Sequence, residues 1–129
     1  MNGFKRKTVI ILMVILLLLT GCSGGSYKIT MGEIDFTKDG VSGGYKEFNG
    51  YQFTSIKLEE GDTISFNLEV TTEEGNFTVK ILDSEGDIIL SINSDEHSKD
   101  LLIEHTGTYR IQVEGDKHEG EFDLVWYVN

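Results

Sequence analysis

The chain has no proline, a single cysteine, and only 11 basic residues against 22 acidic ones among its 129 residues. One cysteine cannot form an internal disulfide, which excludes a disulfide framework. The absence of proline is compatible with strands that use every backbone donor, because proline removes a donor from a sheet. A chain of this length is expected to form one domain.

Basic residues are scarcest beyond the first 22 positions. Lys5, Arg6 and Lys7 are the only charged residues of that first segment, which leaves 8 basic against 22 acidic residues in 23–129, a net charge of −14. This excess argues against nucleic acid as a partner and against electrostatic attachment to an anionic membrane. It leaves open cationic ligands such as metal ions, basic peptides or amino groups of an envelope polymer. The alternative is that the acidity only keeps the domain soluble.

The chain also lacks an apolar run long enough to span a bilayer as a helix, which takes about 20 residues. Val9–Leu19 is apolar throughout but only 11 residues long, and it follows the cationic head MNGFKRK. This order and length match a signal peptide. The alternatives are an uncleaved anchor helix or a secreted protein with a stray cysteine.

The single cysteine follows this run, in Leu19-Thr20-Gly21-Cys22, which resembles the lipobox of bacterial lipoproteins. The resemblance implies that diacylglycerol is attached to the Cys22 sulfur and that residues 1–21 are cleaved as a signal peptide. It therefore predicts a lipid anchor in the cell membrane, with the protein on the extracytoplasmic face. Several acyl chains together hold a protein stably. We expect residues 22–26, ending in SGGS, to form the lipidated tether and residues 27–129 to form the domain.

Beyond the tether, apolar and polar residues alternate as in half-buried strands. The clearest example is TISFNLEVT, where Ile64, Phe66, Leu68 and Val70 share one face. The same alternation predicts further strands at 77–81, 109–113 and 122–128, and weaker ones at 27–31, 44–48, 51–58, 88–92 and 101–104. No stretch of 12 residues after Cys22 shows helical spacing.

The dipeptide Glu-Gly recurs near the expected strand ends, at 60–61, 74–75, 85–86, 114–115 and 119–120. Glycine supplies the positive φ that tight hairpin turns require. Short strands separated by such turns indicate an antiparallel sandwich or barrel. We therefore predict an all-β fold, a single antiparallel, jelly-roll-like β-sandwich of about eight strands.

The C-terminal segment HTGTYRIQVEGDKHEGEFDLVWYV, residues 105–128, combines Gly-x-Tyr, a strand, a glycine-bearing turn and a last strand. With residues 51–70 and 76–89, it resembles bacterial pre-peptidase C-terminal domains and the related GOLD-like jelly rolls. The resemblance covers about residues 48–128 and implies an accessory or recognition module. At the start of its strand, Tyr109 is expected to bond nearby backbone through its hydroxyl, as in a tyrosine corner.

The residue patterns of a catalytic site are missing. His97, His105 and His118 are expected in loops or at strand ends, and their spacing does not match that of zinc ligands. There is no Gly-x-Ser-x-Gly motif for nucleophilic catalysis. We therefore expect no enzymatic activity. The alternative is a small hydrolase with paired carboxylates, which would need two of them to converge in a pocket.

One candidate site is DSEGD at 83–87, where Asp83, Glu85 and Asp87 stand at alternate positions. An EF-hand loop is excluded, because the glycine comes one position early and Ile92 replaces the required glutamate. An irregular calcium site stays open, and the alternative is a solvated turn. No other cofactor is expected.

A second candidate is GGYKEFNGYQF at 43–53, where Tyr45, Phe48, Tyr51 and Phe53 lie among glycines. Exposed rings of this kind stack on sugars or take up a peptide, whereas the alternative is that they cover the core. Together these patterns predict a membrane-anchored, non-catalytic binding module whose partner is an envelope polymer or protein, with no nucleic-acid binding. The alternatives are a structural spacer, a subunit that docks by a sheet edge, and a calcium-stabilised adhesion module.

Overall fold

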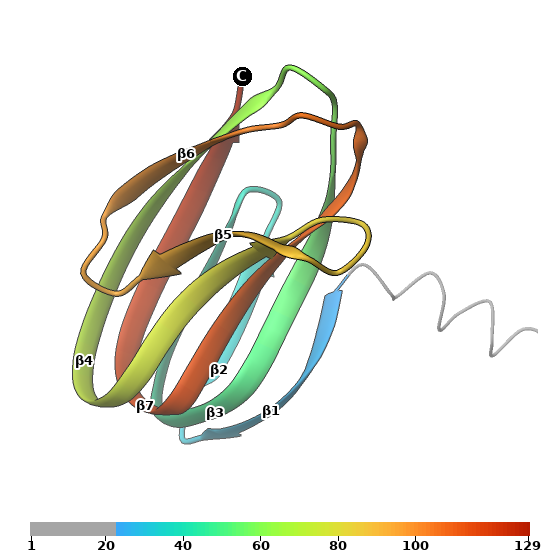
Figure 1. Ribbon diagram of the computed structural model, residues 1–129. Helices are drawn as coiled ribbons and strands as arrows, with labels where there is room; N and C mark the ends of the chain where they lie inside the picture. Colours follow the sequence, from blue (N-terminus) through green and yellow to red (C-terminus); the bar gives the residue numbers. More distant parts are fainter. Residues whose placement is uncertain (1–22) are drawn as a thin grey trace, which may run out of the picture.

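A computed structural model describes residues 23–129, in which seven antiparallel strands form one sheet (Figure 1). The strands are β1 (Ser23–Thr30), β2 (Glu33–Thr37), β3 (Gly40–Leu58), β4 (Thr63–Leu82), β5 (Ile88–Asn93), β6 (Ser98–Leu102) and β7 (Gly107–Val128). The prediction of an all-β antiparallel fold is confirmed. The predicted signal peptide and Cys22, the predicted site of lipidation, lie outside the described residues.

Across residues 23–129 there is no helix with the length and hydropathy needed to cross a membrane.

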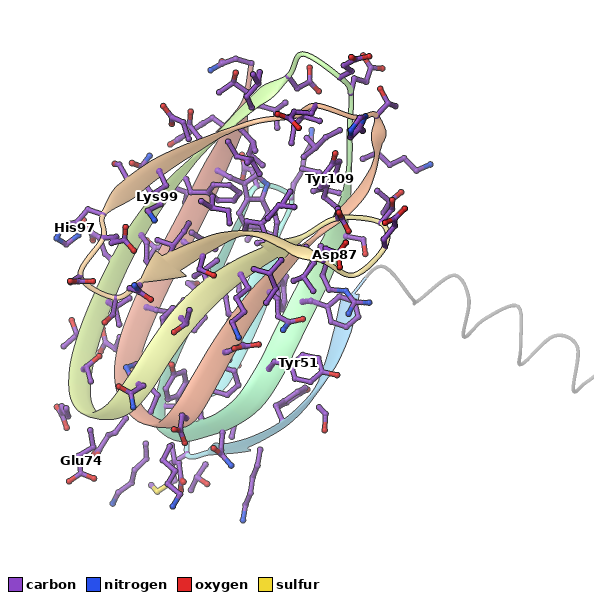
Figure 2. All side chains as sticks on the ribbon, viewed as in Figure 1. Tyr51, Glu74, Asp87, His97, Lys99 and Tyr109 are labelled. Carbon is purple, nitrogen blue, oxygen red and sulfur yellow. The ribbon has the colours of Figure 1, made fainter. Side chains whose placement is uncertain are left out.

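Three very long strands form the frame of the sheet: β3, β4 and β7 have 19, 20 and 22 residues. Strands usually have about 3–10 residues, so strands of this length must bend. The pairing of β7 shifts register against β3 between Tyr45 and Gly50, and against β4 between Thr72 and Asn76. At these bulges each long strand turns at the lower end of Figure 1 and returns in a second layer. Glu74 marks this bend in Figure 2.

The bends fold the single sheet into two layers that face each other. The first half-sheet contains β2, residues 40–45 of β3, 120–128 of β7, 63–72 of β4, and β6. The second half-sheet contains β1, residues 50–58 of β3, 107–115 of β7, 76–82 of β4, and β5. The core lies between them, and its fully buried apolar side chains include Val41, Phe48, Ile64, Phe66, Leu68, Val79, Ile81, Ile92, Ile103, Ile111 and Leu124.

The alternation seen in the sequence predicts correctly which residues face the core. Phe66 and Leu68 are each 1% exposed, whereas Asn67 between them is exposed. Near the end of the chain, Trp126 is 3% exposed and its neighbour Tyr127 is 56% exposed. The side-chain period of two therefore holds along β4 and β7 in the first half-sheet.

The expectation that the Glu-Gly dipeptides lie near strand ends was wrong at three of five places. Those at 60–61 and 85–86 lie in turns, but those at 74–75, 114–115 and 119–120 lie within β4 and β7. Gly75 and Gly120 have φ values of 78° and 148°, which let the strand bend without leaving the sheet. Gly120 also permits a close approach, since a Cβ there would lie 1.9 Å from the Thr71 carbonyl oxygen.

The segment SGGS, expected as a flexible tether, forms the start of β1 instead. Ser23 pairs with Thr54 and Ser26 with Tyr51 in β3. Glycine suits this edge, because a Cβ on Gly25 would lie 2.1 Å from the Tyr51 carbonyl oxygen. β1 therefore includes residues 23–26, which were expected to belong to the tether.

Candidate functional site

The outer face of the second half-sheet carries two aromatic rings side by side. Tyr51 and Phe53 project from β3 to this face, while Gln52 between them is buried. The two ring centroids lie 6.5 Å apart, and the ring planes are inclined by 18°. Both side chains are partly exposed, and Figure 2 shows Tyr51 on the ribbon of the second layer. The two rings are thus nearly parallel neighbours on this face.

The neighbouring strand β7 places a guanidinium group on one of these rings. The Arg110 Cζ lies 3.7 Å from the centroid of the Phe53 ring. A cation over an aromatic ring contributes about 0.5–1 kcal/mol at a partly exposed site. The guanidinium is planar and carries five N–H donors in a fixed arrangement.

A row of polar side chains continues the surface across β7 and β4. Gln112 lies opposite Phe53, and Lys80 lies opposite Gln112 on the other side. The Gln112 Nε2 donates to Glu114 Oε1 at 2.7 Å, and the Lys80 Nζ lies 2.7 Å from Glu114 Oε2. These bonds hold three polar groups beside the rings. We call this surface the aromatic face; it consists of Tyr51, Phe53, Lys80, Arg110, Gln112 and Glu114.

A shallow hollow adjoins each end of the aromatic face. One, of about 280 Å³, is bounded by Tyr51, Thr78 and Glu114 near the bend. The other, of about 360 Å³, is bounded by Ser55, Arg110 and the turn that follows β4. From Tyr51 to Ser55 the strand spans about 13 Å, at 3.3 Å per residue. The face is thus long and open, with room for a chain-like ligand rather than a small enclosed one.

Of the three aromatic residues predicted as a ligand surface, only Tyr51 lies on the aromatic face. Tyr45 and Phe48 are 7% and 0% exposed and belong to the core at the bend. This placement agrees with the alternative interpretation, that these rings cover the core. The β3 bulge between Tyr45 and Gly50 separates the two groups, because it interrupts the regular alternation of the strand.

Sequence reasoning missed Lys80, Arg110, Gln112 and Glu114. They come from two strands that are distant from Tyr51 in sequence, and only the β3–β7 and β4–β7 pairings bring them together. Their alternate spacing in the strand at 109–113 predicts an outward face for Arg110 and Gln112. It does not predict which side chains lie beside them.

A second polar cluster lies inside the core at the bend. The His118 side chain is fully buried, and its Nδ1 lies 2.7 Å from the Tyr45 hydroxyl oxygen. Its Nε2 lies 2.8 Å from Thr72 Oγ1, and the Phe77 ring packs against it at a centroid distance of 5.4 Å. Burial lowers the pKa of His118 and raises the pKa of Tyr45. Both groups are therefore neutral at pH 7, and the cluster ties the two layers together.

The prediction that all three histidines lie in loops or at strand ends was wrong for His118. This residue lies inside β7, and the bend of that strand turns its ring into the core. His97 and His105 are exposed, in loops, as expected.

The carboxylates considered as calcium ligands lie in the turn between β4 and β5. The Asp83 Oδ1 accepts the backbone N–H groups of Glu85 and Asp87, each at 2.9 Å. Glu85 and Asp87 themselves are exposed. In the part of the chain that the structure describes, no three His, Cys, Asp or Glu side chains are grouped so that they could hold a metal ion. The geometry agrees with the alternative, a solvated turn whose backbone Asp83 stabilises.

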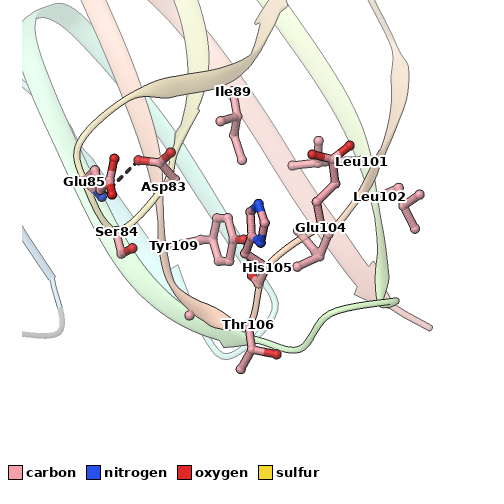
Figure 3. Close-up of a pocket in the computed structure, with 12 residues that line it drawn as sticks. Asp83, Ser84, Glu85, Ile89, Leu101, Leu102, Glu104, His105, Thr106 and Tyr109 are labelled. Atoms are coloured by element: carbon pink, nitrogen blue, oxygen red, sulfur yellow. Dashed lines mark hydrogen bonds between the residues drawn. The ribbon is translucent and has the colours of Figure 1, made fainter.

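A hollow of about 630 Å³ lies beside this turn (Figure 3). In the close-up, Asp83 and Glu85 lie on one side of it and Leu101 and Leu102 on the other, with Tyr109 between them. The Tyr109 hydroxyl donates to the His105 carbonyl oxygen. The prediction of a tyrosine corner is therefore confirmed, and this bond holds the segment between β6 and β7 against the strand.

No family model matches the chain, and no curated protein sequence matches it. Among solved structures, PliG of Aeromonas hydrophila, a periplasmic inhibitor of g-type lysozyme, matches with a TM-score of 0.56 and 14% identity over 79% of this chain and 98% of PliG. A CBM4 carbohydrate-binding module has a TM-score of 0.46 and 15% identity over 88% of this chain and 82% of the module. The mannan-recognising module TmCBM27 has a TM-score of 0.46 and 9% identity over 86% of this chain and 88% of the module. The likeness to PliG shows the fold, and the chain is a β-sandwich.

Proposed function

We propose that the protein is a non-catalytic, membrane-anchored module that binds a glycan of the cell envelope through the aromatic face. The observation that carries the proposal is the pair of nearly parallel rings, Tyr51 and Phe53, on an open sheet face. A pyranose ring has an apolar C–H face that stacks on an aromatic ring, and its hydroxyls need polar partners around the edge. Binding sites that combine aromatic surface with a few placed polar groups meet both needs.

The side chains around the rings supply these polar partners. Arg110 and Lys80 offer donors and Glu114 offers acceptors, while Gln112, only 8% exposed, holds Glu114 in place. Their mutual bonds, 2.7 Å from Gln112 to Glu114 and 2.7 Å from Lys80 to Glu114, restrain them before a ligand arrives. Restraint of this kind lowers the entropic cost of binding. The surface therefore suits a sugar chain better than a flexible apolar peptide.

The proposed anchor places this face close to the membrane. Since β1 begins at Ser23, a lipid on Cys22 would attach directly at the edge of the second half-sheet. Gly24 and Ser26 of β1 lie opposite Phe53 and Tyr51. The module would then hold an envelope glycan near the extracytoplasmic surface of the membrane.

The binding proposal is tested with Tyr51→Ala in the full-length protein, solubilised in detergent and titrated with soluble fragments of envelope polysaccharide. Loss of a stacking residue at the centre of a site is expected to weaken binding by about 10- to 30-fold. Tyr127→Ala is the matched control, because Tyr127 is 56% exposed on the outer face of the first half-sheet. Equal affinity of both variants would show that the aromatic face is not the binding site.

The anchor is tested separately with Cys22→Ala. We expect this variant to leave the membrane fraction on cell fractionation and to retain the all-β circular dichroism spectrum of the domain. Normal retention of the variant in the membrane fraction would refute lipid attachment at Cys22.

A further inference from the structure

The strands of the two outer faces of the sandwich differ in the charges that they carry. Six carboxylates project from the strands of the first half-sheet: Glu33, Asp35, Glu69, Asp100, Glu121 and Asp123. The lysine of these strand segments, Lys99, lies opposite the inward-facing Phe66, and the exposed Lys46 follows them at the bend of β3. The second half-sheet carries Lys28, Lys57, Lys80 and Arg110, against Glu114 and, at the bend, Asp116. Half of the eight basic residues in 23–129 therefore gather on the face that holds the aromatic rings.

Three of these four cations form no ion pair within the described chain. The ion pairs among residues 23–129 are Lys80 with Glu114 and Lys99 with Glu96. Lys28, Lys57 and Arg110 take part in neither. With 22 acidic residues in that range, carboxylates are plentiful, yet those of the first half-sheet project from the opposite side of the sandwich. The strands on this side thus carry four cations against two carboxylates, Glu114 and Asp116, while Asp83 and Glu85 of the turn after β4 line the hollow beside Arg110.

The cations follow the length of the aromatic face. Lys57 and Arg110 lie toward one end of the aromatic face. Arg110 is opposite Ser55 of β3, and Lys57 follows Ser55 by two residues. Lys28 lies toward the other end, opposite Asn49. From Asn49 to Lys57, β3 covers about 26 Å at 3.3 Å per residue, with the two rings between them. A sugar chain lying on the rings along β3 would pass each of these cations.

We infer that the glycan bound by the aromatic face is anionic and carries carboxylate or phosphate groups along its chain. This inference rests on the proposed function and adds the charge of the ligand. The Arg110 guanidinium, held on the Phe53 ring, presents paired donors that match a carboxylate or phosphate. The carboxylates of the first half-sheet repel the same polymer, which restricts it to one side of the sandwich.

The test compares charged polymers with neutral polymers of the same sugar, using the full-length protein in detergent. Polygalacturonic acid against its methyl ester tests carboxylate, and phosphomannan against mannan tests phosphate. We expect at least one charged polymer to bind about tenfold more tightly than its neutral counterpart at about 50 mM salt. Raising the salt to about 500 mM should remove most of this preference, because the Debye length shrinks several-fold.

Variants assign the effect to this face. The double variant Lys28→Gln/Lys57→Gln should lose the preference for the charged polymer but keep the affinity for the neutral one. Lys38→Gln, an exposed lysine in the turn between β2 and β3, is the control and should change neither. Tyr51→Ala should weaken binding of both polymers.

Two outcomes overturn the inference in distinguishable ways. In the first, the protein binds charged and neutral polymers with equal affinity at both salt concentrations, and Tyr51→Ala still loses this binding. That result refutes the anionic ligand and leaves the proposed function standing. Binding of none of the four polymers, or polyanion binding that Tyr51→Ala leaves intact, refutes the proposed function together with the inference.

Discussion

The buried histidine should make the domain lose stability as the pH falls below about 6.5. His118 has no exposed surface, and its two ring nitrogens contact the Tyr45 hydroxyl and Thr72 Oγ1, both of which are neutral. Neither partner is an anion that would compensate a proton on the ring. Burial therefore lowers the pKa of His118 from its ordinary value of 6.5.

The sign and size of the effect follow from proton binding. Because the pKa is lower in the folded state, the unfolded chain takes up the proton first as the pH falls. The stabilisation is complete above the unfolded pKa of 6.5 and is lost as the pH falls below it. While His118 stays neutral in the fold, lowering the pH from about 7.5 to 5.5 should cost up to about 1.4 kcal/mol of the free energy of unfolding.

The assay is urea unfolding at three pH values, for the wild type and for His118→Gln. Glutamine offers a donor and an acceptor but does not titrate, so the difference between the two proteins isolates the histidine from the 22 acidic residues. His105→Gln, at an exposed position, is the control and should follow the wild type.

Equal losses of free energy in the wild type and His118→Gln between pH 7.5 and 5.5 would refute the reasoning. Should the glutamine variant be too unstable to measure, Tyr45→Phe provides an independent test. It removes one hydrogen bond, for a loss of about 1 kcal/mol, but keeps the buried histidine. Its free energy of unfolding should therefore retain the pH dependence of the wild type.

Three further predictions concern the bend, the tyrosine corner and the acidic face. Gly120→Ala should destabilise the domain by about 1–3 kcal/mol in urea unfolding, because φ is 148° and a Cβ would lie 1.9 Å from a carbonyl oxygen. Gly44→Ala, whose Cβ would make an ordinary contact at 3.5 Å, should be far milder, and equal losses would contradict the role assigned to the bend. Tyr109→Phe should cost about 1 kcal/mol in the same assay; an unchanged midpoint would mean that the tyrosine corner adds no net stability. Glu69→Lys should stabilise by about 0.2–1 kcal/mol, more at low salt, because Glu69 lies directly opposite Asp123; destabilisation at low salt would show that this pair is not repulsive.

Local patterns in the sequence determine the strands and the direction of most side chains. The alternation around Phe66 and Leu68 predicts both the strand and its buried face, because a period of two is a property of a single extended chain. The hydroxyl bond of Tyr109 is likewise predictable, since its acceptor lies only four residues earlier.

Only the tertiary structure decides what happens at the glycines. A glycine with positive φ, such as Gly75, fits both a hairpin turn and a bent strand. Which of the two forms depends on whether β4 pairs with itself or with β7. The same pairing buries His118, which stands among acidic and glycine residues and reads as exposed in the sequence. It also puts Arg110 on the Phe53 ring and brings half of the basic side chains of residues 23–129 to one face. Pairing between distant strands is a property of the whole sheet, so neither the aromatic face nor its charge is visible in any single segment of the chain.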